Sequence, residues 1–392
     1  MKFVKNYLSL SLIAVVAVLM TILGATGNLL GSTSAFLEES AIAIILAVSL
    51  NMVVGFLGEL SLGHAGFMCV GAYVGGKIAA LLAETAIGGT NIVTVIITIL
   101  VGGLAAGVCG FIVGLPALRL RGDYLAIVTL AFGEIIKNII EKTAFLGKES
   151  GLDTPSFTKD RNIRFILFTI SAVVVILTVF VIQNVIKSKH GRAITAIRDN
   201  EIAARATGIN VTKYKLMGFV ISAVFAGFAG VLYSYSKMSI QASTFDYNYS
   251  IEILVIVVLG GMTINGSIIS AILITGFNHV LQNQNAITDF LRIIIGEDYA
   301  VAKDIIYAIV LILLIIYRNA PALKRFREKY NIKNLWNKIF KPKHDPSKVR
   351  DDATRWDVVP TKIEMDEVLS TDIVIDNMGD NSADIGERGG NK

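Results

Sequence analysis

Residues 187–215 read KSKHGRAITAIRDNEIAARATGINVTKYK and form the one substantial polar stretch inside the hydrophobic part of this chain. Apolar segments lie on both sides of it, at residues 163–186 and 216–235. In membrane proteins, a short loop rich in Lys and Arg between two such segments stays on the cytoplasmic side. The stretch therefore predicts a cytoplasmic loop, with cations at Lys187, Lys189, Arg192, Arg198, Arg205, Lys213 and Lys215.

The composition also favours a membrane protein. Of the 392 residues, 54% are hydrophobic and 17% are charged, and the mean hydropathy is +0.64. Soluble domains carry about 25% charged residues. The pI near 9.0 is also typical of nucleic-acid-binding proteins. Here the cations lie beside apolar segments, so membrane orientation and contact with anionic lipid explain them better. The predicted fold is an all-α polytopic membrane protein.

Ten apolar segments approach the roughly 20 residues that cross a bilayer as a helix, although several are shorter. The first also fits a cleaved secretory signal, but its length and the spans that follow favour a retained helix. Threading them alternately places residues 187–215 and both termini in the cytoplasm, and residues 146–164 outside, where their cations fit least well. The segments are residues 8–23, 35–55, 62–82, 92–115, 124–145, 163–186, 216–235, 250–260, 268–282 and 305–317.

The 187–215 loop contains the signals of a short helix. Asp199 or Asn200 can cap its start over residues 201–207, and Gly208 can end it. A helix of that length spans roughly 10 Å at about 1.5 Å per residue. It is too short to cross a membrane and has the size of a docking element for another protein.

Glycines interrupt two apolar stretches at corresponding places. Residues 42–76 break at residues 55–58 and resume after LSLGHAG at residues 60–66, and residues 251–276 break at GGMTING, residues 260–266. This pattern favours a parallel internal repeat. Irregular backbone at membrane depth survives only where protein covers it or where it lines a cavity, so the breaks are predicted to abut a transport pathway. The alternative is that the glycines only let helices pack closely.

Small residues at helical spacing predict close helix packing, mostly within this chain, although a membrane dimer would use the same residues. One set belongs to the segment 92–115 and the other to the segment 216–235. They are Gly102, Ala106, Gly110 and Gly114, and Gly218, Ser222, Ala226 and Gly230.

The sequence carries no motif of a nucleotide-binding or catalytic site. It lacks the GxxxxGK[ST] loop that binds ATP phosphates, and also the HExxH and GxSxG patterns of metalloproteases and serine hydrolases. Cys69 and Cys109 fall in apolar segments without CxxC spacing, so they indicate neither a disulfide framework nor a metal site. The sequence therefore predicts no enzyme, no metal and no cofactor. If the chain takes part in ATP-driven transport, another subunit supplies the ATPase.

Polar residues inside apolar segments are costly in lipid, which makes each a pathway candidate. Simpler interpretations compete: Glu59 lies at a span boundary, Lys77 can reach the membrane surface, and Glu134 can pair with Lys137. The polar set is Asn51, Glu59, His64, Lys77, Glu134, Lys137, Asn138, Glu252, Asn278 and His279. With the glycine breaks included, the predicted translocation path is Asn51, Gly63, His64, Gly66, Glu134, Asn138, Glu252, Gly260 and Gly261.

The chain divides into three regions by composition. Residues 1–317 form the predicted transmembrane permease domain, which includes the 187–215 loop. Residues 318–349 are basic, with Trp336 and Phe340, and fit a segment lying on an anionic membrane surface. Residues 350–392 are acidic and polar, and they predict a disordered cytoplasmic tail.

Four motifs occur in order along residues 41–317. They are LSLGHAGF at 60–67 with GAY at 71–73; LRLRGDYLAIVTLAFGE at 118–134; GRA at 191–193 with IRDNEIAA at 197–204 and Gly208; and FAGFAG at 225–230 followed by VVLGGM at 257–262. Together they resemble the membrane subunit of bacterial branched-chain amino acid ABC importers, the high-affinity leucine, isoleucine and valine permease family. The RLRGDY stretch is the most specific of them.

The resemblance implies a permease of the bacterial plasma (inner) membrane. Its implied partners are a second homologous permease, two cytoplasmic ATPases, membrane lipid and an extracytoplasmic substrate-binding protein; nucleic acid is not among them. Residues 146–155 lack the family's GGxNG run and residues 261–267 are altered, so urea or short amides stay open as alternative substrates, and a secondary transporter as an alternative mechanism. The implied ATPase-coupling residues are Arg198, Asp199, Glu201, Ile202, Ala203, Ala204 and Gly208.

Overall fold

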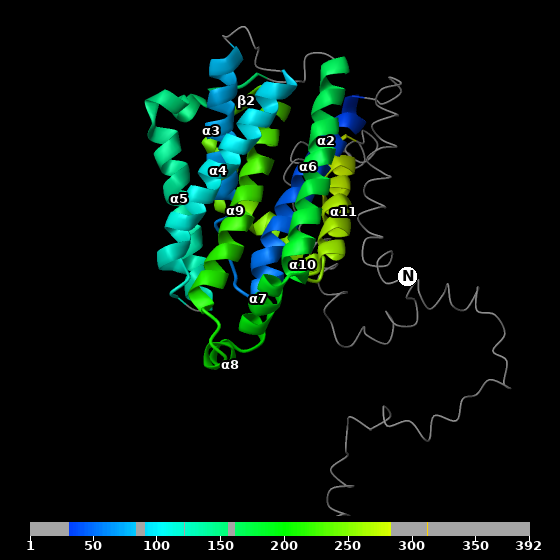
Figure 1. Cartoon of the computed structure of the whole chain (residues 1–392). Helices are drawn as coiled ribbons and strands as arrows, with labels where there is room; N and C mark the ends of the chain where they lie inside the picture. The colour runs from blue at the N-terminus through cyan, green and yellow to red at the C-terminus, as the bar shows by residue number, and fades with distance from the viewer. Residues whose placement is uncertain (1–30, 84–90, 121, 156–160, 284–311, 313–392) are drawn as a thin grey trace, which may run out of the picture. The chain divides into compact units, whose positions relative to one another are not determined.

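The long apolar runs form helices, because a helix satisfies its own backbone hydrogen bonds where lipid cannot. The structure, a computed structural model, describes residues 31–83, 91–120, 122–155, 161–283 and 312. Figure 1 shows the long helices lying side by side. They are α2 (Gly31–Asn51), α3 (His64–Ala83), α4 (Ile92–Ala117), α5 (Asp123–Lys142), α6 (Arg161–Lys187), α7 (Lys189–Asp199), α8 (Glu201–Ala206), α9 (Val211–Ser236), α10 (Tyr247–Leu259) and α11 (Ile264–Asn283).

Short elements connect these helices. The π-helix η1 (Met52–Leu57) continues α2 directly. Three 3-10 turns follow later in the chain: η2 (Ala144–Leu146), η3 (Lys148–Ser150) and η4 (Ala242–Phe245). Two residues of β1 (Leu152–Asp153) pair antiparallel with two of β2 (Ser239–Ile240).

Eight of the ten predicted spans fall in the part of the chain that the structure describes, and each coincides with a helix. Five helical segments there are long and apolar enough to cross a membrane; α10, with 13 residues, is shorter. The helical fold with several membrane spans is therefore confirmed, whereas the number ten and the internal repeat are not. Outside the described residues lie the spans 8–23 and, apart from Ile312, 305–317, together with the basic segment 318–349 and the acidic tail 350–392. The five segments are Ala35–Leu57, His64–Ala83, Ile92–Ala117, Ile166–Lys187 and Val211–Ser236.

Glycines let α9 pack closely against α3 and α4. A Cβ atom added to Gly71 of α3 would lie 2.3 Å from the carbonyl oxygen of Gly227 on α9. One added to Gly110 of α4 would lie 2.5 Å from the Cβ of Ala223. Such distances leave no room for a side chain, so the helix backbones meet directly. The predicted close packing within one chain is confirmed for Gly102, Gly110, Gly114 and Gly230.

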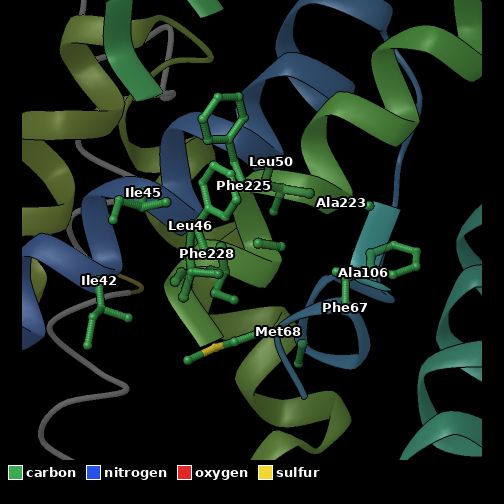
Figure 2. Packing of buried hydrophobic residues seen from close by; sticks show 14 of the residues in the cluster. Ile42, Ile45, Leu46, Leu50, Phe67, Met68, Ala106, Ala223, Phe225 and Phe228 are labelled. Carbon is green, nitrogen blue, oxygen red and sulfur yellow. The ribbon is translucent and has the colours of Figure 1, made fainter. Parts of the chain in front are cut away.

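Larger side chains fill the space between α2 and α9. Figure 2 shows Leu46 and Leu50 of α2 close to Phe225 and Phe228 of α9. The two phenyl rings meet edge to face, with centroids 5.4 Å apart. Helices in lipid associate through van der Waals packing of this kind rather than through the release of water. This core fixes α2 against α9, and so fixes the two chain segments that meet at the candidate site.

The two ends of the helices carry different connections. At one end, α7 and α8 lie beyond the start of α9 (Figure 1). At the other end, Leu152 of β1 pairs with Ile240 of β2, which follows the end of α9. The α5–α6 connection and the α6–α9 connection therefore lie at opposite ends, as the alternating threading requires.

Candidate functional site

α8 is a helix of six residues whose own sequence fixes both of its ends. The side-chain oxygen of Asn200 accepts a hydrogen bond from the backbone N–H of Ala203 at 3.0 Å. This bond satisfies one of the donors that a helix start leaves open. Gly208 has a φ of +84°, the left-handed conformation that glycine adopts easily after a helix. The predicted capped helix is confirmed, with Asn200 rather than Asp199 as the cap and Ala206 as its last residue.

The two faces of α8 differ in exposure. Ile202 is 76% exposed, and Ala203 beside it is also exposed. Ala204 is only 4% exposed and packs with Ile197 of α7 and Val211 of α9. α8 thus presents an apolar side chain outward, while Ala204 belongs to a small core that holds the helix in place.

Lys215, near the start of α9, joins α8 to the segment that follows α2. Its side chain is 5% exposed, and its ammonium donates hydrogen bonds to the carboxylates of Glu59 and Glu201. The distance to Glu201 Oε2 is 3.1 Å, and Glu201 Oε1 lies 2.7 Å from Arg205. A buried ammonium is stable only with such partners. The network therefore locks three chain segments together through one cation.

Arg198 forms a second link between the same segments. Its guanidinium donates to the carbonyl oxygen of Gly55, in η1, at 3.0 Å. It also pairs with Asp199 at 2.9 Å, which orients the side chain. A Cβ atom added to Gly58, whose φ is +77°, would lie 2.5 Å from Arg198 Cγ. The end of α7 thus rests directly on the first glycine break.

The second glycine break lies beside the first. In the turn between α10 and α11, Gly261 and Met262 have φ values of +70° and +56°. With its amide oriented to satisfy both partners, the buried Asn51 side chain donates to Met262 O at 3.2 Å and accepts from Ile264 N at 3.3 Å. The two breaks and Arg198 line a groove with a volume of about 540 Å³ at the α8 end of the helices. Gly260 lies against the backbone of Ser267 inside the turn.

Gly63 and Gly66, from the predicted path, lie against the backbone of α5. A Cβ atom on Gly63 would come within 2.3 Å of Thr129 O, and one on Gly66 within 2.7 Å of Gly133 Cα. Their neighbour His64 is 2% exposed, and its Nε2 lies 2.9 Å from Ser49 Oγ. This geometry favours the packing alternative for the two glycines.

Hydroxyl groups satisfy the start of α3. The backbone N–H of Leu62 donates to Thr129 Oγ1 at 3.1 Å, and that of Ala65 donates to Ser250 Oγ at 3.1 Å. The first N–H groups of a helix have no partner within the helix, and an unpaired one at membrane depth is costly. The hydroxyls allow α3 to begin inside the protein.

Glu134 and Asn138 lie one turn apart on α5. The carboxylate of Glu134 lies 2.6 Å from Lys137 Nζ and accepts from the backbone N–H of Tyr247 at 3.1 Å. The predicted Glu134–Lys137 pair is confirmed, and Glu134 also fixes the start of α10. Asn138 is exposed and donates to the carbonyl of Glu134 at 2.7 Å.

Glu252, the remaining path residue, lines a cavity of about 240 Å³ between α2, α9, α10 and α11. This cavity lies in the half of the helices farther from α8, since its lining includes Tyr233 in the last turn of α9 and Lys237 directly after that helix. Asn278 and His279, also in the predicted polar set, line it as well.

Sequence reasoning named Glu59, Glu201 and Lys215 separately but missed their network. Lys215 and Glu59 are 156 residues apart, and a contact at that separation leaves no local signal in one sequence. The hydroxyl partners of α3 were missed for the same reason.

Comparisons with known proteins agree with this architecture. The family described as "Branched-chain amino acid transport system / permease component" matches residues 32–316. The chain is 34% identical over 322 residues to the permease protein LivM of the high-affinity branched-chain amino acid transport system of Escherichia coli (strain K12), covering 75% of this chain and 70% of that protein. It is 36% identical over 287 residues to the protein of the same name from Salmonella typhimurium, with coverages of 66% and 64%.

A third relative carries a different name. The probable branched-chain amino acid transport permease protein LivH of Methanocaldococcus jannaschii is 29% identical over 183 residues, or 46% of this chain and 54% of that protein. No solved structure matches the chain. The family match includes every helix from α2 to α11, the capped α8 and both glycine breaks. The chain therefore belongs to the family of permease components of branched-chain amino acid transport systems.

Proposed function

We propose that this chain is a membrane-spanning subunit of an ATP-binding-cassette importer that carries branched-chain amino acids into the cell. The family match over residues 32–316 carries the proposal, and the LivM relatives are named for that transport. Two ATPase subunits on the cytoplasmic side supply the energy, and an extracytoplasmic binding protein delivers the substrate. The chain itself is a transport permease rather than an enzyme.

α8 is the element that the ATPase moves. Its capped ends and the buried Ala204 make it a rigid unit, and Ile202 gives it an exposed apolar contact for a partner groove. Ile202 and Ala203 meet the ATPase, while Ala204 and Gly208 keep the shape of the helix. Glu201, Arg198 and Asp199 hold α8 and α7 against the rest of the protein.

The movement of α8 reaches the glycine breaks through two contacts. Glu201 is tied to Glu59 through Lys215, and Arg198 is tied to Gly55. Asn51 continues the connection to the turn between α10 and α11. A displacement of α8 would therefore open or close the groove at this end, which is where the path reaches the cytoplasm.

The α8 end faces the cytoplasm and so do both termini. The Lys and Arg residues of the 187–215 loop support this orientation through the positive-inside rule. Glu39, in the half of α2 farther from α8, then lies toward the outer side, where the α5–α6 connection also lies.

α5 faces the second permease and the pathway between the two. The outward residues of α4 are apolar throughout, for example Leu104, Val108 and Ile112, and suit lipid. On α5, by contrast, the exposed Asn138 follows Glu134 at one helical turn, and lipid would make these groups costly. The existence of a LivH relative beside the LivM relatives supports a pair of homologous but different permeases.

The test is leucine uptake into proteoliposomes that contain this chain with a second permease and two ATPases, in the presence of binding protein and ATP. Uptake should require every component and should stop when the ATPase is inactivated. Uptake by this chain alone under an ion gradient would support a secondary transporter instead. Uptake of urea or acetamide in place of leucine would instead mean that the chain belongs to an importer of urea or short amides.

A further inference from the structure

The cavity lined by Glu252 has a polar half and an apolar half. Its lining on α2 is Glu39, Ile42, Ala43 and Leu46, which lie on one face of that helix. In that order they run toward the α8 end, so the carboxylate comes first and the aliphatic side chains lie deeper.

α10 repeats the same order along its own length. Tyr249 and Glu252 precede Ile253 and Ile256, and the helix runs toward the α8 end, where the α10–α11 turn lies. Lys237, directly after α9, and His279 of α11 join at the end of the cavity away from α8. The cavity thus has charged and hydrogen-bonding groups at its outer part and isoleucine and leucine side chains at its inner part.

The polar half carries charges of both signs. Lys237 Nζ lies 3.1 Å from Glu39 Oε1, with each side chain about two-fifths exposed, at 39% and 43%. Glu252, on the facing helix, adds a second carboxylate. A neutral solute such as an amide would need no charged partner, whereas an ammonium and a carboxylate entering a membrane protein each need a group of opposite charge.

The size of the cavity fits one small molecule. Its volume is about 240 Å³, well above the roughly 10–15 Å³ that a single water molecule needs. An amino acid with a four-carbon side chain has nine non-hydrogen atoms and needs a space of that order.

We propose that this cavity is a binding site for a zwitterionic aliphatic amino acid within the permease. The ammonium of the ligand faces Glu252, its carboxylate faces Lys237, and its side chain lies against Leu46, Ile253 and Ile256. The inference rests on the proposed function, and it adds a site within the membrane subunit that selects for charge and chain length after the binding protein has released the substrate.

The experiment measures equilibrium binding of radiolabelled L-leucine to the purified full chain in lipid nanodiscs. L-Isoleucine should displace the labelled leucine. L-Leucinamide, which lacks the carboxylate, and 4-methylpentanoate, which lacks the ammonium, should displace it at least ten times less well. Urea, which carries no charge, should also displace it at least ten times less well. Glu252→Gln should weaken binding at least tenfold. The matched control is Glu141→Gln on α5, which makes the same chemical change at a partly buried site outside the cavity and should leave binding unchanged.

A second variant changes the shape of the cavity instead of its charge. Ala43→Leu extends a side chain into the apolar half of the cavity. It should lower the ratio of the affinity for leucine to the affinity for alanine, whereas partial unfolding would weaken the binding of both. Absence of leucine binding to the wild-type chain, equal binding in Glu252→Gln, or equal displacement by leucinamide would overturn the proposal. If any of these three results is found while the complete transporter still takes up leucine, the site is wrong but the proposed function stands. If the complete wild-type transporter shows no ATP-dependent leucine uptake, the proposed function is wrong.

Discussion

Lys215 and Glu59 are 156 residues apart in the sequence, yet they share a hydrogen bond at a site where the lysine side chain is 5% exposed. Glu201 of α8 completes the site from its other side. The cation therefore connects α8, the proposed coupling helix, to Glu59 beside the first glycine break. Its removal should affect both the stability of the protein and the coupling to ATP hydrolysis.

Replacing Lys215 with Met should destabilise the protein strongly. The variant leaves the carboxylates of Glu59 and Glu201 close together without their cation, and breaking a buried pair in this way costs about 3–5 kcal/mol. The midpoint of thermal unfolding of the purified chain should fall, and substrate-stimulated ATP hydrolysis by the assembled transporter should be lost.

Arg205→Gln provides the matched control. Arg205 pairs with the same carboxylate, but its side chain is 56% exposed, and exposed pairs contribute about 0–1 kcal/mol. Its unfolding midpoint should stay close to that of the wild type. Equal midpoints for the Lys215 and Arg205 variants would mean that the buried network does not stabilise the fold.

The contrast between α8 and this network shows what one sequence can reveal. The cap at Asn200 and the terminator at Gly208 act within a few residues, so the sequence alone predicts the helix. The partners of Lys215 depend on how α2 packs against α9, and no local pattern encodes that packing. The burial of Ala204 against Ile197 and Val211 likewise depends on how α7, α8 and α9 pack together.

Substitutions on the two faces of α8 should separate docking from folding. Ile202→Ser should reduce substrate-stimulated ATP hydrolysis by more than tenfold, because Ile202 is the exposed apolar contact, while the unfolding midpoint stays unchanged. Ala204→Leu should lower the midpoint, because overpacking a small core costs about 1–3 kcal/mol. The exposed Lys213→Gln should change neither quantity. Full stimulation in Ile202→Ser would exclude this face as the docking surface.

The orientation of the helices can be read from thiol labelling. In the α5–α6 connection, Thr154 is a poor position for a probe, since it is buried and its hydroxyl donates to Ser234 O at 2.7 Å. In α7, Thr195 is partly buried and donates to Gly191 O at 2.9 Å. The exposed Ala196 and Ser150 are better. In a background without Cys69 and Cys109, Ala196→Cys should react with a membrane-impermeant maleimide only from the cytoplasm, and Ser150→Cys only from outside. Reaction of both from one side would contradict the threading.

The predicted spans match the helices where the length of an apolar run sets the length of the helix. Their predicted bounds differ from the structure where a helix begins or ends inside the protein. α4 ends at Ala117, two residues beyond the predicted span 92–115, and α9 begins at Val211, five residues before the predicted span 216–235, because its mostly polar first residues VTKYK also fold as a helix. The span 35–55 was expected to end at a glycine, but the chain continues as the π-helix η1 to Leu57. The start of α3 depends on hydroxyls from α5 and α10, which hydrophobicity cannot indicate.

Solvent access distinguishes the two parts of the glycine-rich region. Met262 is 44% exposed and lines the groove at the α8 end, whereas Ala65 is 1% exposed at the start of α3. A water-soluble thiol reagent should therefore modify Met262→Cys and leave Ala65→Cys unmodified. Because Arg198 at the end of α7 lines the groove, and α8, the proposed coupling helix, follows directly, ATP turnover with loaded binding protein should change the rate of thiol modification at position 262. If Met262→Cys is modified at the same rate in every nucleotide state, the groove does not move during transport.

Gly66→Ala tests the packing role from the other side. The added methyl would lie 2.7 Å from Gly133 Cα, where backbone rather than a flexible side chain must give way, so α3 and α5 would be forced apart. Overpacking of this kind costs about 1–3 kcal/mol, and the unfolding midpoint should fall. Gly261→Ala meets a different constraint, a φ of +70° in an exposed turn. It should reduce transport while lowering the unfolding midpoint less than Gly66→Ala does. If Gly66→Ala keeps its stability but loses transport, the start of α3 would belong to the pathway after all.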